Sequence, residues 1–314
     1  VRINSPIIIY ANNLQKGVVI LYKTRKHKLK IFLILIVSFF LIFGFNGNKI
    51  QAEDDKLIVS VGITPLKNFA QEIGGENIEV SVMVPPGYSP ANYAPSPSEM
   101  RKLSEADIYL SLGMPTERSN ILPKLNNFND KIDLLRLDKL VNEKYSARKF
   151  SNGGVDPHIW LSPNRAKYMV EMITEKFIEL APEHKTYFKN RSKNYLKRLN
   201  ELDNYISKKL NELNGKYIII YHPVLGYLTE EYGLEMEAIE KNGKKATPKR
   251  LAEIINLAKN EKIKTIFHQS TIDSKQTQVI ANEIKGKTVQ INPLSDNYIK
   301  NMKRIADLIA KSYE

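Results

Sequence analysis

Residues 183–213 read EHKTYFKNRSKNYLKRLNELDNYISKKLNEL, a stretch of 31 residues that contains neither glycine nor proline. Its apolar side chains recur three, four or seven positions apart, at Phe188, Tyr195, Leu199, Leu202, Ile206, Leu210 and Leu213. This spacing predicts one face of a single long helix, and Pro182 marks its start. At about 1.5 Å per residue, such a helix is roughly 46 Å long.

Short runs rich in β-forming residues alternate with helical segments on both sides of this helix. The runs span 56–62, 78–84, 106–113 and 132–137 before it, and 217–221, 235–239, 263–267 and 287–291 after it. Strands that alternate with helices indicate a mostly parallel sheet covered on both faces. The sequence therefore predicts an α/β protein with two similar lobes. Each lobe is expected to hold a four-stranded mostly parallel sheet with flanking helices.

We expect the N-terminal lobe to span 53–182, the linking helix 183–213 and the C-terminal lobe 214–314. A continuous helix between lobes resists bending more than extended linkers do. The sequence therefore favours modest rocking of one lobe against the other over wide hinge closure.

Residues 1–52 have the pattern of an export signal. A basic cluster at Lys23–Lys30 precedes an apolar run at Ile31–Phe45, and Ala52 offers a small residue for cleavage. We expect residues 1–22 to be an over-extended start, and the folded part to be exported to the periplasm. The alternative is an uncleaved signal that anchors the protein, although the run is shorter than the about 20 residues that span a bilayer.

Composition excludes several classes of function. The net charge is +13, but residues 1–52 carry eight basic and no acidic groups, so the remainder carries 39 basic against 34 acidic groups. No nucleic-acid motif accompanies this mild excess, and we expect no nucleic-acid partner. The chain has no cysteine, which excludes disulfides, thiolate metal sites and a lipidated N-terminal cysteine.

Three of the five histidines are candidate metal ligands, because ligands of open α/β sheets bind beyond the carboxyl ends of strands. His158 lies in the proline-flanked segment DPHIWLSP, His222 ends the run 217–221, and His268 follows the run 263–267. Strand alternation points His268 and its neighbour Gln269 to opposite faces, so one of the two is expected to face the cleft. His27 falls in the export signal and His184 at the start of the long helix.

Six motifs in order carry a resemblance to the zinc/manganese solute-binding proteins of ABC transporters. They are PPGYSPANYAPSP at 85–97, Ala106-Asp107 with Gly113 and Glu117, DPHIWLSP at 156–163, HPVLGY at 222–227, EYGL at 231–234 and Pro293-Leu294. The resemblance covers about residues 57–314. It implies two α/β lobes bridged by a long helix, with metal held in the cleft between them.

This sequence matches the family's metal ligands at only two of their four positions. His158 and His222 match the second and third positions. Ala91 stands at the first position and Asn292 at the fourth, and Ala94 replaces the glutamate beside the first. Two imidazoles do not close a four-coordinate zinc site. His268, Asn292 and Asp296 are therefore the further candidates, together with Asn92, Tyr93 or water.

The function that the resemblance implies is capture without catalysis. The protein is expected to bind Zn²⁺, with Mn²⁺ as the second choice, and to deliver it as a monomer to an ABC permease. Three imidazole nitrogens favour zinc over manganese, which prefers oxygen donors. Two alternatives stay open. One is an exported metallo-hydrolase with a three-histidine zinc site. The other is a family member with a degenerate metal site that binds another ligand or acts as an adhesin.

Overall fold

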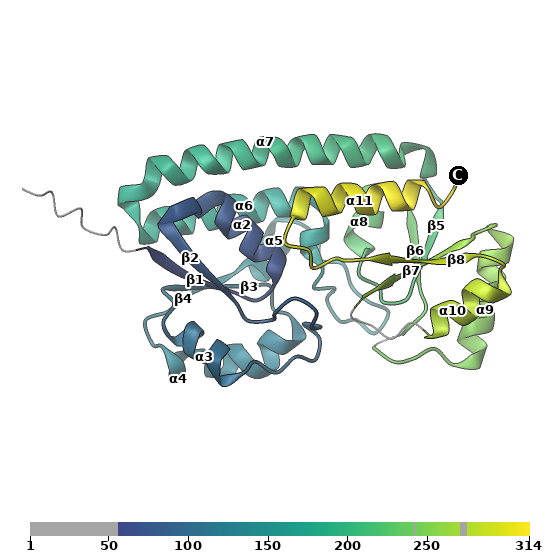
Figure 1. Cartoon of the computed structure of the whole chain (residues 1–314), viewed down its shortest axis with the longest axis horizontal. Helices are drawn as coiled ribbons and strands as arrows, with labels where there is room; N and C mark the ends of the chain where they lie inside the picture. The colour runs from purple at the N-terminus through teal and green to yellow at the C-terminus, as the bar shows by residue number, and fades with distance from the viewer. Residues whose placement is uncertain (1–55, 242, 271–274) are drawn as a thin grey trace, which may run out of the picture. The chain divides into compact units, whose positions relative to one another are not determined.

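The structure, a computed structural model, describes residues 56–241, 243–270 and 275–314 (Figure 1). The predicted export signal at 1–52 lies outside these residues. Among the helices of the described part, none combines the length and the apolar character that a membrane span requires.

The N-terminal sheet has four parallel strands in the order β2-β1-β3-β4. The strands are β1 (Leu57–Val61), β2 (Ile78–Val82), β3 (Ile108–Ser111) and β4 (Asp133–Arg136). The two central strands are rich in β-branched and apolar residues, and all four residues of β3 are buried. Near-continuous apolar strands are typical of a parallel sheet that helices cover on both faces.

The C-terminal sheet repeats this arrangement, with four parallel strands in the order β6-β5-β7-β8. The strands are β5 (Tyr217–Ile220), β6 (Glu235–Ala238), β7 (Thr265–Gln269) and β8 (Lys287–Ile291). In both sheets the first strand of the lobe lies between its second and third strands. The prediction of two similar four-stranded parallel sheets is confirmed.

Ten α-helices surround the sheets in the described part of the chain. They are α2 (Thr64–Gly74), α3 (Pro97–Ser104), α4 (Leu125–Phe128), α5 (Leu137–Lys144), α6 (Pro163–Leu180), α7 (Lys185–Leu210), α8 (Gly226–Glu231), α9 (Pro248–Asn260), α10 (Lys275–Glu283) and α11 (Tyr298–Ala310).

The long helix predicted over 183–213 is α7, with a short 3-10 turn at each end. Its 26 α-helical residues bury the predicted apolar face, from Phe188 to Leu210. Figure 1 shows α7 running past both sheets, and α2, α6 and α11 pack against it. The α-helical part measures about 39 Å at 1.5 Å per residue.

One continuous apolar core joins the two sheets. It includes Val59 and Leu110 of the N-terminal sheet, Leu199 of α7, and Ile220 and Phe267 of the C-terminal sheet. One smaller apolar cluster accompanies each sheet. A core shared through α7 limits independent motion of the lobes, because bending between them would expose buried apolar surface. The exact lobe boundaries stay predictions.

Candidate functional site

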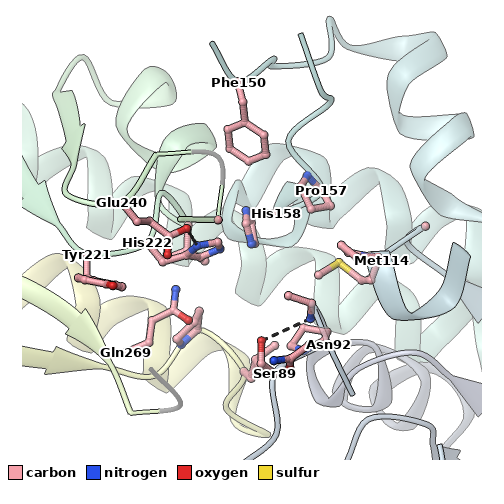
Figure 2. A pocket seen from close by; sticks show the side chains of 18 of the residues that line it. Ser89, Asn92, Met114, Phe150, Pro157, His158, Tyr221, His222, Glu240 and Gln269 are labelled. Carbon is pink, nitrogen blue, oxygen red and sulfur yellow. Dashed lines mark hydrogen bonds and ion pairs between the residues drawn. The ribbon is translucent and has the colours of Figure 1, made fainter. Parts of the chain in front are cut away.

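A cavity of about 490 Å³ lies where the central strands of both sheets end (Figure 2). Gly113 and Met114 reach it from the segment after β3, and His222 reaches it from the end of β5. Gln269, the last residue of β7, also lines it. In each sheet these strands flank the point where the strand order reverses, which is the usual ligand position in open α/β sheets.

His158 lies at this cavity, and a buried carboxylate fixes the orientation of its ring. Its Nδ1 donates to Oδ1 of Asp156 at 2.7 Å, and its backbone N–H donates to the same oxygen at 3.0 Å. Asp156 is fully buried and also accepts a hydrogen bond from Arg148 at 3.0 Å. Burial lowers the pKa of His158. The neutral ring therefore keeps an unprotonated Nε2, the form that binds metal.

His222 lies beside His158 in the same cavity and is also bonded to a carboxylate. It follows β5, and its Nδ1 donates to Oε1 of Glu240 at 2.5 Å. Glu240 follows the neighbouring strand β6, so parallel pairing brings the carboxylate beside the ring. A carboxylate on one ring nitrogen fixes the tautomer and strengthens the other nitrogen as a metal ligand. Nε2 of His222 is thereby prepared as a ligand.

The two imidazoles lie close enough to share one ion. Their ring centroids are 5.2 Å apart and their planes are 83° apart. Zinc–nitrogen bonds of about 2.0–2.1 Å place two ring centres roughly 5 Å apart when both rings bind one tetrahedral ion. Figure 2 shows both rings beside the same space.

Buried hydrogen bonds connect the segment that carries His158 to the C-terminal part of the molecule. Tyr227, from α8, donates its hydroxyl to the backbone oxygen of Asp156 at 2.9 Å and accepts from the Arg148 N–H at 3.1 Å. Trp160 Nε1 donates to the backbone oxygen of Pro293 at 2.9 Å. These hydrogen bonds fix the distance between the two histidines, and no ligand is needed for this.

Among the other candidate ligands, Asn92 lines the cavity, whereas Tyr93, His268, Asn292 and Asp296 do not. His268 does not line the cavity, whereas its neighbour Gln269 does, as strand alternation requires. Asn292 is also not a lining residue, and its side-chain oxygen accepts from the Leu294 N–H at 3.1 Å. Asp296 lies in a separate depression with Glu72 and Arg198. Within the described ranges, no three His, Asp or Glu side chains are grouped closely enough to hold a metal ion.

Three residues of the site are not among the site residues predicted from the sequence. Glu240 pairs with His222, and Arg118 and Lys245 line the cavity from opposite sheets. Glu240 could have been found as a polar residue directly after the run 235–239, because such positions share one edge of the sheet. Arg118 lies in a short π-helical turn (Glu117–Ile121) and Lys245 in the loop between β6 and α9, and neither position has a comparable signal.

Comparisons with known proteins identify the relatives of this chain. Residues 59–312 match the family described as ZnuA, zinc-uptake complex component A periplasmic. The high-affinity zinc uptake system protein ZnuA of Bacillus subtilis (strain 168) is 26% identical over 279 residues, covering 83% of this chain and 88% of that protein. A putative metal-binding protein of Treponema pallidum (strain Nichols) is 28% identical over 257 residues, covering 77% of this chain and 81% of that protein.

A crystal structure of ZnuA has the same fold. Its TM-score is 0.78 at 28% sequence identity, and the match covers 83% of this chain and 100% of that one. The resemblance derived from the six motifs is confirmed. The chain belongs to the ZnuA family of periplasmic zinc-uptake components.

Proposed function

We propose that this protein captures a divalent transition metal, zinc in preference to manganese, in the cavity between its two sheets and delivers it to an ABC permease. The observation that carries the proposal is the pair of imidazoles at 5.2 Å, each with Nδ1 bonded to a carboxylate. Carboxylate–histidine pairs of this kind are typical of metal sites.

The donor chemistry favours zinc. Neutral imidazole nitrogen is a good ligand for zinc, whereas manganese favours carboxylate, carbonyl and water oxygens. His158 and His222 are the two protein ligands that we propose. The similarity to the zinc uptake protein of Bacillus subtilis supports the same choice of metal.

Capture in this site needs no catalytic group. The protein acts as a monomer in the periplasm, binds the ion reversibly and presents it to the membrane permease. The family description, a periplasmic component of a zinc-uptake complex, supports this location and partner. The shared core and α7 favour small local changes on loading over wide closure of the lobes.

Calorimetry with Zn²⁺ and Mn²⁺ on the purified protein tests the proposal. We expect one zinc ion per chain, weaker manganese binding, and a loss of zinc affinity of at least about 100-fold in His158→Ala and in His222→Ala, because each removes half of the protein's nitrogen donors. His184→Ala is the matched control, since His184 lies at the start of α7 and does not line the cavity. Wild-type protein that takes up neither metal would refute the proposal and favour a member that binds another ligand.

A further inference from the structure

The protein supplies too few ligands for the ion alone. Ala91 lines the cavity at the position where the family resemblance places a histidine, and its side chain cannot coordinate metal. Asn292 stands at another ligand position, yet it does not line the cavity. Zinc is four-coordinate in most protein sites, and for the two positions beyond His158 and His222 the cavity offers the neutral amide of Asn92 but no further histidine.

The cavity is much larger than one metal ion needs. Its volume of about 490 Å³ lies within the range of about 300–1,000 Å³ that is typical of sites for small organic molecules. Apolar and aromatic side chains form much of its wall, among them Met114, Phe150, Val155, Trp160, Val224 and Leu294. A wall of this kind suits the carbon skeleton of an organic molecule and offers nothing to a hydrated ion.

One polar group in the wall lacks a partner. Gln269 is only 6% exposed, and its Nε2 makes no hydrogen bond within the described part of the chain. Figure 2 shows its side chain directed to the space beside His222. A buried amide without a partner costs free energy, so its presence here points to an acceptor on the cargo.

Two cations without carboxylate partners line the same cavity. Arg118 stands after β3, and Lys245 stands between β6 and α9, so they belong to opposite sheets. Both are exposed, and neither side chain has a hydrogen bond or ion pair with another described residue. Cations that converge on a cavity from two sides suit a ligand that carries more than one carboxylate.

From these observations we propose that the cargo is a zinc complex of a small amino-carboxylate chelator. The proposal rests on the function proposed above and names its substrate class. His158 and His222 bind the ion, and the chelator's amine and carboxylate groups fill the remaining coordination positions. Gln269 Nε2 donates to a chelator carboxylate, Arg118 and Lys245 pair with its outer oxygens, and the apolar wall contacts its methylene groups.

The test compares zinc presented alone, with nitrilotriacetate and with L-histidine. Nitrilotriacetate leaves coordination positions on the metal that two imidazoles can fill. We expect calorimetry to show at least tenfold tighter binding of a chelated form than of zinc alone. Native mass spectrometry should detect protein, zinc and chelator in a 1:1:1 complex.

Variants in the wall test the proposed contacts. Gln269→Met keeps the volume but removes the amide, and we expect it to weaken ternary binding about tenfold without loss of thermal stability, because no existing hydrogen bond is broken. Lys245→Gln and Arg118→Gln should also weaken ternary binding, while binding of zinc alone stays unchanged. Lys244→Gln is the matched control, because Lys244 carries the same charge and does not line the cavity.

The outcomes separate this inference from the proposed function. If the protein strips zinc from both chelators and leaves them in solution, the chelate proposal is wrong and zinc capture stands. If ternary complexes form but the three wall variants bind them as the wild type does, the assigned contacts are wrong. If neither zinc nor its complexes bind, the proposed function itself fails.

Discussion

His222 and Glu240 form a hydrogen-bonded pair across two neighbouring parallel strands, with Nδ1 and Oε1 2.5 Å apart. The pair repeats the arrangement of the neighbouring His158 with Asp156. Each imidazole is therefore oriented by a carboxylate that does not itself need to touch the ion. Because each ring has its own carboxylate, the two histidines are oriented as metal ligands and do not merely lie close together.

The contribution of Glu240 can be measured directly. Glu240→Gln replaces a charged acceptor by a neutral one, which weakens the hold on the His222 tautomer and lowers the basicity of Nε2. We expect about a tenfold loss of zinc affinity, at the lower end of the 10–100-fold typical of such partners. Competition with a fluorescent zinc chelator measures this loss. Glu235→Gln, an exposed position at the start of β6, should change nothing; equal affinity in both variants would contradict the role of Glu240.

The position of His268 gives a second prediction. Its side chain does not line the cavity, because Gln269 occupies the alternate position of β7 that does. We therefore expect His268→Ala to bind zinc within about twofold of the wild type. Calorimetry under the conditions used for His222→Ala makes the comparison. A loss as large as that of His222→Ala would show that His268 moves into the cavity on loading.

Much of the fold could be predicted from the sequence because the signals are local. Apolar periodicity identified α7, and short β-rich runs identified the eight strands. Helix α6 has the same kind of signal, because its buried residues Ala166, Met169, Val170, Ile173 and Phe177 have helical spacing.

The site could be predicted less completely, because its geometry depends on long-range packing. Strand alternation predicts that His268 and Gln269 face opposite sides of the sheet. Which of the two side chains faces the cavity depends on how β7 packs against the other lobe. Glu240 lies 18 residues beyond its partner His222, and only the pairing of β5 with β6 brings them together. Arg118 and Lys245 line one cavity only because two sheets associate, which no local pattern encodes.

Restoring a ligand gives a third prediction. Ala91 lines the cavity and is exposed, so an imidazole at this position has room to reach the ion. We expect Ala91→His to bind zinc alone at least tenfold more tightly, because three protein nitrogens are typical of firmly held zinc. The variant should also reduce the difference in binding affinity between chelated zinc and zinc alone. Ala94→His is the control, since Ala94 does not line the cavity; equal gains in both variants would refute a specific third ligand.

A buried carboxylate next to the cavity gives a prediction about stability and pH. Glu117 is fully buried, and it accepts hydrogen bonds from the Tyr109 hydroxyl at 2.7 Å and from the Met114 N–H at 2.7 Å. Burial raises the pKa of Glu117 above its usual 4.5. The folded state therefore binds this proton more tightly than the unfolded state does. The stability that this proton contributes is complete below pH 4.5 and is lost as the pH rises through the folded-state pKa.

Glu117→Gln removes this titration, because glutamine stays neutral at every pH. We expect the free energy of unfolding of the wild type, minus that of Glu117→Gln, to fall as the pH rises from 4 to 7. Urea unfolding at pH 4, 5.5 and 7 measures the difference, and groups that titrate equally in both proteins cancel. A difference that grows with pH would mean that the hydrogen bonds from Tyr109 and Met114 outweigh burial and stabilise the ionised carboxylate.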